Sequence, residues 1–278
     1  VAFQRGGSHN LYTASSDRTI KVWDIKDAAY LETLYGHQDK VYAIDSHRKE
    51  RCITVGHDDT ARLWKISDEV QLILRGDKGV SIDCVAMINE QFFVTGSNDG
   101  TLALWDIGKK KPIFVVRNAH ASSGKEDEES DSDNDDSATE WPSVAPAAST
   151  EPYWIVSVAA VRNGDVVASG SWDGFLRLWK CVISTTAKDG SPQRRGLSLL
   201  CQIEVPGFIN SLEFSKTGER LLAGVGQEHR LGRWFRDRDA RNSIWVIDFV
   251  VPTQEEADDS ESDDDNDDDD DDERNDSD

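Results

Sequence analysis

The sequence contains few of the residues and motifs that mark metal, disulfide or nucleotide chemistry. Its four cysteines, Cys52, Cys84, Cys181 and Cys201, are widely spaced and include no Cys-x-x-Cys pair. This spacing excludes a zinc ribbon and gives no disulfide framework. No histidine pair follows HxxxH or HExxH, and no glycine-rich segment follows the phosphate-cradling pattern GxxxxGK with a final Ser or Thr. We therefore expect no metal, no cofactor and no small-molecule substrate.

Long apolar segments are missing as well. No run approaches the roughly 20 apolar residues that a membrane-spanning helix needs, and no basic and then apolar leader opens the chain. We expect a soluble intracellular protein without a membrane partner. Because the chain starts at Val1, without a methionine and inside an expected strand, we also expect an N-terminal truncation.

Acidic residues outnumber basic residues, but they are concentrated in two segments. The 278 residues include 53 Asp and Glu against 31 Lys and Arg, a formal net charge of -22. Residues 125–140 carry nine acids and one base, residues 255–278 carry seventeen acids and one base, and the rest of the chain is close to +2. Such segments cannot bury enough apolar surface to fold, so we expect a disordered acidic insertion at 121–153 and a disordered acidic tail at 250–278. The folded remainder can still bind a polyanion.

A segment with a central tryptophan recurs along the chain. Trp23, Trp64 and Trp105 are separated by 41 residues each, and Trp179 follows after the acidic insertion. The four copies are SSDRTIKVWDI (15–25), GHDDTARLWKI (56–66), SNDGTLALWDI (97–107) and SWDGFLRLWKC (171–181). A period of 40–45 residues with GH and WD signatures is typical of the WD40 propeller, in which each repeat is a four-stranded blade.

The fold class that this repeat predicts is an all-β WD40 β-propeller with five blades in this chain. A fifth and degenerate copy, VGQEHRLGRWF (225–235), places Trp234 at the tryptophan position. We expect four strands in each of the blades 1–34, 41–74, 80–116, 154–204 and 208–249, with a polar and basic loop insertion at 182–198. Five such blades do not close the usual seven-bladed ring, and an open ring would leave unpaired sheet edges. We therefore expect two missing N-terminal blades.

Polar residues at fixed distances from each tryptophan resemble the hydrogen-bond relay of WD40 blades. In that family an aspartate, a histidine, a hydroxyl residue and the tryptophan satisfy one another and lock one corner of the blade. The matching residues are Thr13, Asp17 and Trp23; His37, Thr54, Asp58 and Trp64; Thr95, Asp99 and Trp105; and Ser169, Asp173 and Trp179. His120 is a candidate for the fourth histidine, and Gly224 and Glu228 replace the hydroxyl and the aspartate in the fifth copy. Because an Asp, His and Ser set recurs here at structural spacing, we assign it to stability and not to catalysis.

Basic residues are expected to gather on one face of the propeller. In such a fold the turns between the second and third strands and the loops between blades lie on one face, and acids predominate there. The remaining loops lie on the other face, where bases predominate. We expect the densest basic patch to combine Lys188, Arg194 and Arg195 with Arg236, Arg238 and Arg241. His229, Arg230 and Arg233, beside Trp234 and Phe235, are further candidates, because arginine and aromatic side chains suit phosphates and unpaired RNA bases. The alternatives are a solvated loop surface for the patch and core packing for Trp234.

Longer segments resemble one branch of this fold. SHNLYTASSDRTIKVWDI, YLETLYGHQDKVYAID and above all FINSLEFSKTGERLLAGVGQEHRLGRW are similar to the U3 small nucleolar RNA-interacting WD40 family. The likeness implies a nucleolar protein that binds U3 small nucleolar RNA with the box C/D core proteins and small-subunit processome proteins. It also implies a role in pre-rRNA processing and small ribosomal subunit biogenesis, and a seven-bladed ring.

Two other functional classes stay open at this point. The acidic tail suits a WD40 histone chaperone that binds basic histones, and the acidic face suits a general protein-interaction scaffold. An enzyme is the weakest of the options that we consider, and we expect a binding protein.

Overall fold

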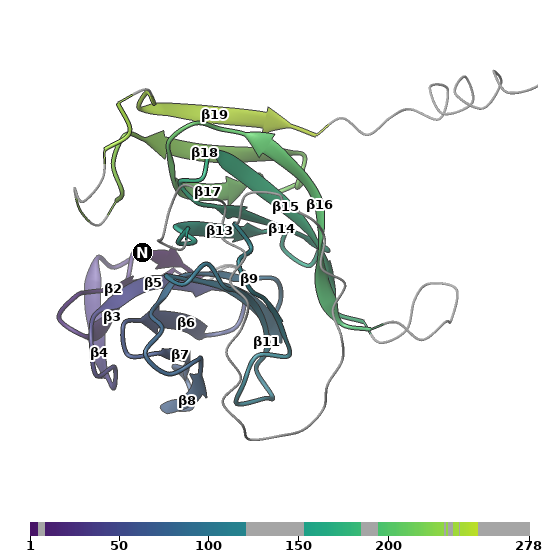
Figure 1. Ribbon diagram of the computed structural model, residues 1–278. Helices are drawn as coiled ribbons and strands as arrows, with labels where there is room; N and C mark the ends of the chain where they lie inside the picture. Colours follow the sequence, from purple (N-terminus) through teal and green to yellow (C-terminus); the bar gives the residue numbers. More distant parts are fainter. Residues whose placement is uncertain are drawn as a thin grey trace, which may run out of the picture. The chain divides into compact units, whose positions relative to one another are not determined.

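The computed structural model of the chain consists of strands and loops, and the residues that it describes include no helix. These residues are 1–4, 9–120, 153–184, 194–230, 232, 236–238 and 240–249. Val1–Ile247 form one compact unit, and Asp248–Asp278 form a second. Within the described residues the strands form five antiparallel sheets, as Figure 1 shows. The prediction of an all-β chain is therefore confirmed. None of the described segments forms a helix that is long and apolar enough to cross a bilayer.

The first three sheets follow one another along the chain, and each has four strands in sequence order. The first contains β1 (Ala2–Phe3), β2 (Asn10–Ala14), β3 (Thr19–Asp24) and β4 (Ala29–Tyr35). The second contains β5 (Val41–Ser46), β6 (Arg51–Gly56), β7 (Thr60–Lys65) and β8 (Val70–Arg75). The third contains β9 (Ile82–Met87), β10 (Phe92–Ser97), β11 (Leu102–Asp106) and β12 (Phe114–Val116).

The last two sheets differ in their number of strands. The fourth contains β13 (Ser157–Ala160), β14 (Val166–Gly170), β15 (Phe175–Val182) and β16 (Gly196–Glu204). The fifth contains β17 (Phe208–Phe214), β18 (Arg220–Gly226) and β19 (Ser243–Asp248). We expected a fourth strand in this sheet, and the described residues form three.

The tryptophan that we assigned to the fifth sheet is not part of its third strand. The third strand is β19, which begins well after Trp234 and carries Trp245 instead. Between β18 and β19 lies a long connection, 227–242, in which an isolated bridge pairs Glu228 with Arg236. The error arose because GRW mimics the repeat, whereas the residues after Trp234 are charged and lack strand alternation. Trp234 itself lies outside the described residues.

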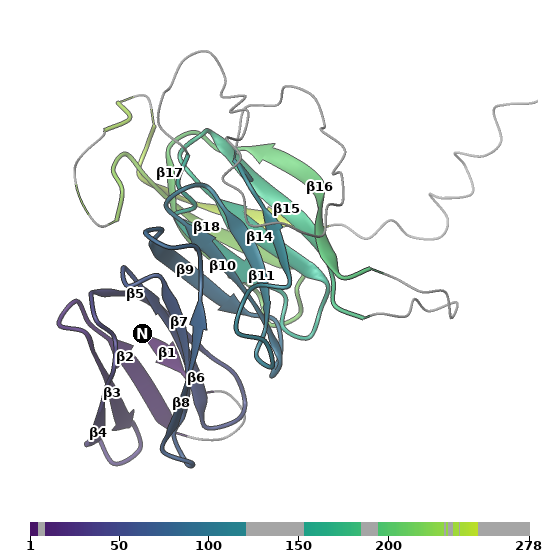
Figure 2. The ribbon, with the colours of Figure 1, turned by 60° about the horizontal axis from the view of Figure 1, so that its bottom comes forward.

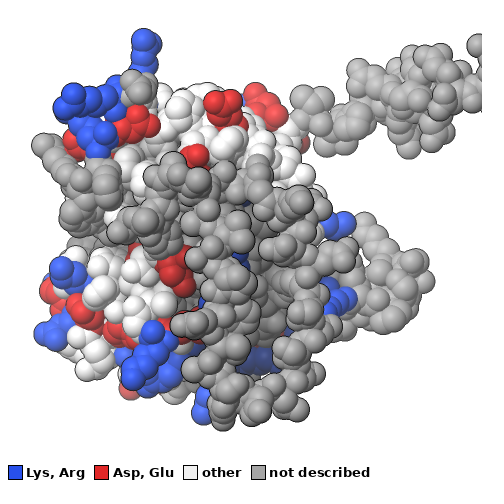
Figure 3. Space-filling model, viewed as in Figure 1, with Lys and Arg blue, Asp and Glu red and all other residues white. Residues whose placement is uncertain are grey.

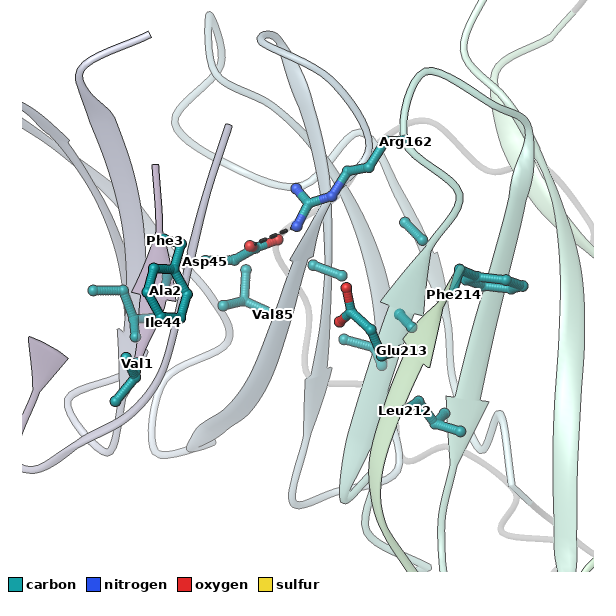
Figure 4. Close-up of a pocket in the computed structure, with 14 residues that line it drawn as sticks. Val1, Ala2, Phe3, Ile44, Asp45, Val85, Arg162, Leu212, Glu213 and Phe214 are labelled. Carbon is teal, nitrogen blue, oxygen red and sulfur yellow. Dashed lines mark hydrogen bonds and ion pairs between the residues drawn. The ribbon is translucent and has the colours of Figure 1, made fainter. Parts of the chain in front are cut away.

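The first strand of each sheet lies at the centre of the arrangement, and the other strands follow outward in chain order. The strands β1, β5, β9, β13 and β17 are successive neighbours, and the sheets fan out from them (Figure 2). These five strands line a cavity of about 360 Å³, shown in Figure 4. The five sheets thus have the arrangement of propeller blades.

Neighbouring sheets bury apolar side chains between them, and the repeat tryptophans of the second, third and fourth sheets each face the sheet that precedes their own. Trp64 packs in a cluster with Tyr12 and Val22 of the first sheet. Trp105 packs with residues of the second sheet such as Leu63, and Trp179 joins a cluster with the third sheet. Every residue of β10 is buried, because successive side chains of a strand point to opposite faces and both faces are covered here.

Two glycines permit the close approach of neighbouring sheets. A Cβ atom at Gly96, the penultimate residue of β10, would lie 2.4 Å from the Cγ2 atom of Ile155 in the segment before β13. A Cβ atom at Gly170, the last residue of β14, would lie 2.4 Å from Cγ2 of Ile209 in β17. A side chain at either position would push two sheets apart.

The predicted relay is complete in the second sheet. His37 Nδ1 lies 3.0 Å from both carboxylate oxygens of Asp58, and its Nε2 lies 2.7 Å from Thr54 Oγ1. Trp64 Nε1 donates a hydrogen bond to the same Thr54 oxygen at 2.8 Å. Burial alone would raise the pKa of the Asp58 carboxyl, but the hydrogen bonds that it accepts, the one from His37 above all, hold this pKa well below its usual range.

The fourth sheet contains the same relay, with His120 as the histidine. His120 Nδ1 lies 3.1 Å from Asp173 Oδ1, its Nε2 lies 2.7 Å from Ser169 Oγ, and Trp179 Nε1 donates to that oxygen at 2.8 Å. Burial lowers the pKa of His120. Burial would raise the pKa of Asp173, but hydrogen bonds and charge from His120 and Arg177 lower it overall.

The first and third sheets hold a reduced form of the relay. Each tryptophan still donates to its hydroxyl partner, Trp23 to Thr13 at 3.0 Å and Trp105 to Thr95 at 2.9 Å. The aspartates of these two sheets accept hydrogen bonds from residues of their own turns; they are Asp17 and Asp99.

A buried arginine joins each complete relay, and the sequence reasoning did not identify it. Arg62 donates to Asp58 at 3.5 Å and to Gln71 at 3.0 Å, and Arg177 forms a short contact with Asp173. Both arginine side chains are at most 6% exposed. The signal was present in the sequence, because the second and fourth copies contain RLW where the first and third contain KVW and ALW.

Loss of the buried carboxylate in the fourth sheet should strongly destabilise the protein. Asp173→Asn leaves the buried Arg177 guanidinium without its counter-charge, which typically costs about 3 kcal/mol or more. In a domain of this size, this corresponds to a fall in Tm of roughly 6–12 °C, measurable by thermal melting followed by circular dichroism. The control is Asp17→Asn, because Asp17 is exposed and its loss should leave the Tm almost unchanged. Equal shifts for the two variants would contradict this account.

Stability should also fall on acidification, in two stages. The pKa of His120 is lower in the folded protein than its unfolded value of about 6.5, so stability begins to fall as the pH drops below about 6.5. The pKa values of Asp58 and Asp173 are lowered too, so their contribution is present above about pH 4 and is lost as the pH falls through the folded values.

Thermal melting between pH 7 and pH 4 checks the first stage of this prediction. His120→Gln should make the Tm depend less on pH in the first stage. The same substitution at the exposed His9 should leave the dependence of the Tm on pH unchanged. A wild-type Tm that stays constant over this range would refute the assignment.

Candidate nucleic-acid interface

The connection between β18 and β19 presents several arginines at one end of the sheets. β18 ends at Gly226, which pairs with Phe208 at the start of β17. The start of β17 lies beside the turn after β14, because the Ile209 amide donates to the Ser171 carbonyl at 3.0 Å. The connection 227–242 therefore begins on the same face as the turns between the second and third strands.

Hydrogen bonds from one glutamine hold both ends of this connection. The Gln227 amide donates to Asn242 Oδ1 at 3.0 Å, and its side chain donates to the Ala240 carbonyl at 2.8 Å. Gln227 Oε1 in turn accepts a hydrogen bond from Arg236 at 2.9 Å. The backbone of the connection is thereby fixed at its base.

Three exposed arginines lie in the later part of the connection: Arg236, Arg238 and Arg241. Arg236 Nε lies 3.9 Å from Glu228 Oε1, a contact that contributes little at a surface. Figure 3 shows blue atoms gathered at the upper left, where Figure 1 places this connection. These three arginines are close in sequence and available for an anionic partner.

His229 and Arg230 lie at the start of the same connection but are held by the fold. His229 is buried, and its ring meets Trp154 and Phe208 edge to face. Burial, and then the charge of Arg230, lower the pKa of His229 to about 4, so the ring is neutral at pH 7. Arg230 donates to the Asp83 carbonyl of the third sheet at 2.8 Å, and its own amide donates to an asparagine of β17.

The structure separates the arginines that we expected to form one patch. Arg194 and Arg195 precede β16 and follow the far end of β15, whereas 227–242 lies beside the start of β15 (Figure 1). A strand of eight residues spans roughly 26 Å, so the two groups occupy opposite faces. The expectation failed because it treated Trp234 as part of the third strand, which moved the following arginines to the wrong face.

Arg195 is also committed to the contact between two sheets. Its Nε donates to the Ile183 carbonyl at 2.9 Å, its Nη1 lies 3.4 Å from Asp106 Oδ2, and its guanidinium lies 5.0 Å from the Phe92 ring centroid. Arg194 is exposed. Two of the remaining candidates, Lys188 and Arg233, lie outside the described residues.

An aromatic group borders the connection, and the sequence reasoning missed it. Trp172 stacks on Phe208 at 5.8 Å and 13°, and the Trp172 ring also lies 5.0 Å from Tyr153 and 6.5 Å from Trp154. A signal was available, because Trp172 stands immediately before the relay aspartate, where the other copies have Ser, His or Asn. Among the residues that the structure describes, no group of three or more His, Cys, Asp and Glu could hold a metal ion.

Comparisons with known proteins agree with this architecture. A family model described as "WD domain, G-beta repeat" matches residues 1–24, 29–65, 69–106 and 148–180. The U3 small nucleolar RNA-interacting protein 2 of Homo sapiens is 45% identical over 64% of this chain and 31% of its own length. Ribosomal RNA-processing protein 9 of Saccharomyces cerevisiae is 33% identical over 89% of this chain and 50% of its own length.

A solved structure extends the likeness to three dimensions. The structure of U3-55K superposes with a TM-score of 0.73 at 44% identity and covers 89% of this chain and 66% of its own. The chain spans about half the length, or less, of the curated relatives it matches. The chain belongs to the WD40 repeat family, and its relatives within that family include the U3 small nucleolar RNA-interacting protein 2 and the ribosomal RNA-processing protein 9.

Proposed function

We propose that this chain is the propeller of a non-catalytic RNA- and protein-binding subunit of the U3 small nucleolar ribonucleoprotein. It acts there in pre-rRNA processing and small ribosomal subunit biogenesis, in the nucleolus of the cell nucleus. The observation that carries the proposal is the 45% identity to a protein named for its interaction with U3 small nucleolar RNA. Box C/D core proteins and small-subunit processome proteins are its partners in this proposal.

We propose that RNA binds to three arginines of the connection 227–242, namely Arg236, Arg238 and Arg241. We call this surface the arginine connection. Exposed guanidinium groups pair with phosphates and release counterions when they bind. The backbone that carries them is fixed by Gln227, so little order is lost when RNA binds. Arg194 and Arg195 are not part of this surface, since they lie on the opposite face.

Crosslinking in cells tests the proposed function directly. Ultraviolet crosslinking of the full-length tagged protein, followed by sequencing of the attached RNA, should show strong enrichment of U3 RNA over other small nucleolar RNAs. Background RNA together with copurifying histones would support the histone-chaperone alternative, and background RNA with other proteins would support a general scaffold.

Charge reversal at the arginine connection should weaken RNA binding without unfolding the protein. For R236E/R238E/R241E in the full-length protein, we expect the slope of log K against log salt to become shallower by about 2, because three phosphate contacts are lost. Fluorescence anisotropy with labelled U3 RNA across a salt titration measures this slope.

The matched control is K109E/K110E/K111E, which reverses three exposed lysines in the turn after β11. An equal loss in the control would show that total charge, and not this surface, determines binding. An unchanged slope in the arginine variant would reject the surface. A melting curve of each variant confirms that the fold is intact.

A further inference from the structure

A second group of basic side chains lies on the face opposite to the arginine connection. The turn between β5 and β6 carries Arg48 and Lys49, both exposed, and β6 opens with Arg51. The first strand of each sheet begins on the face of the connection, as β17 does, and ends on the opposite face, where the chain turns back into the antiparallel second strand. The turn after β5 therefore lies on the face opposite to the connection. We call Arg48, Lys49, Arg51 and the facing Lys65 of β7 the basic corner.

The backbone of the basic corner is fixed by an acid from the neighbouring sheet. Glu90 Oε1 accepts hydrogen bonds from the amides of Arg48 and Lys49 at 3.0 Å and 3.2 Å, and it lies 2.6 Å from His47 Nδ1. Burial would raise the pKa of Glu90, but the hydrogen bond from His47 and those from the amides lower it, so the carboxylate is ionised at neutral pH. Glu90 therefore orders the turn through two backbone amides and His47.

The basic side chains of this corner are not paired with an acid in the part of the chain that the structure describes. Within the described part of the chain, the side chains of the basic corner make no hydrogen bond or ion pair. Arg51 and Lys65 are direct partners across β6 and β7, and like charges placed directly opposite each other destabilise a sheet. Glu50, which lies between Lys49 and Arg51 in sequence, accepts a hydrogen bond from Ser67 at 2.6 Å instead. The fold thus holds two like charges together at a cost to its own stability.

The basic corner borders a hollow of suitable size for an anionic group. The hollow has a volume of about 430 Å³, and all four bases line it. Gln4 lies at its edge, but both ends of the Gln4 amide are used inside the fold, toward Tyr12 and toward the Arg48 carbonyl. Glu50 and Asp68, both exposed, are the acids of the lining, against four bases. The hollow therefore has an excess of positive charge carried by side chains that a ligand can reach.

We propose that the basic corner binds phosphates of the same RNA strand that the arginine connection binds, as a second contact on the opposite face. This inference rests on the proposed function. Two bases on a fixed turn and two on the adjoining strands β6 and β7 match the repeating charge of a nucleic-acid backbone, and they offer no apolar or aromatic group that would read a base. The RNA then passes around the edge of the propeller, and each contact raises the local concentration of RNA at the other.

The test compares three variants of the full-length protein by anisotropy with labelled U3 RNA at salt concentrations between about 50 and 200 mM. R48E/K49E/R51E reverses the basic corner, R236E/R238E/R241E reverses the arginine connection, and K109E/K110E/K111E is the control of equal charge. We expect the basic-corner variant to bind about tenfold more weakly or worse, with a salt slope shallower by about 2. The control should retain most of the affinity. The single variant K65Q, which removes one charge without reversing it, should lower the slope by less than 1.

The outcomes separate this inference from the function on which it rests. If the arginine-connection variant loses affinity and the basic-corner variant does not, the second contact is wrong and the proposed function stands. If the wild-type protein shows no preference for U3 RNA over an unrelated RNA of equal length, the proposed function itself is wrong. Equal losses in the basic-corner variant and in the control would also overturn the inference, because charge alone would then explain the effect. Binding of an acidic peptide in competition with RNA, abolished by R48E/K49E/R51E only, would instead identify a protein partner for the basic corner.

Discussion

The structure depends on the burial of both faces of each central sheet against its neighbours. The residues of β10 show this constraint most plainly, because Val94 packs toward the fourth sheet and Phe93 toward the second. A single four-stranded sheet cannot bury its apolar residues alone, and apolar burial contributes about 25 cal/mol per Å². The glycines at 96 and 170 permit the short spacing between the sheets, and the relays fix the corners from which the connecting loops leave.

The regular part of this architecture could be predicted from the sequence because its determinants are local. An aspartate, a hydroxyl residue and a tryptophan at constant spacing identify each of the first four sheets, and in each of them the tryptophan donates a hydrogen bond to the hydroxyl residue that the spacing indicated. The fifth sheet could not be predicted in this way. Its third strand contains Trp245 without a relay aspartate, and the GRW segment supplied a false tryptophan at the expected position.

The candidate interface was harder to predict than the fold because it depends on the face of the propeller on which each loop lies. One misplaced strand moved Arg236, Arg238 and Arg241 to the wrong face and paired them with Arg195, which the structure uses between two sheets. Composition also conceals which basic residues are available. Arg62 and Arg177 are buried beside carboxylates, whereas Arg48 and Lys49 are exposed, and a count of basic residues does not distinguish these pairs.

The direction in which the tryptophans pack has a consequence for how the protein is made. Trp64, Trp105 and Trp179 each pack toward the sheet that precedes their own, so every new sheet meets a partner surface that the ribosome has already released. Contacts between adjacent sheets join residues that are near in sequence, which keeps the entropic cost of closing each loop low. The chain can therefore assemble one sheet at a time during synthesis, and a nascent chain exposes a single unfinished apolar face at its growing end.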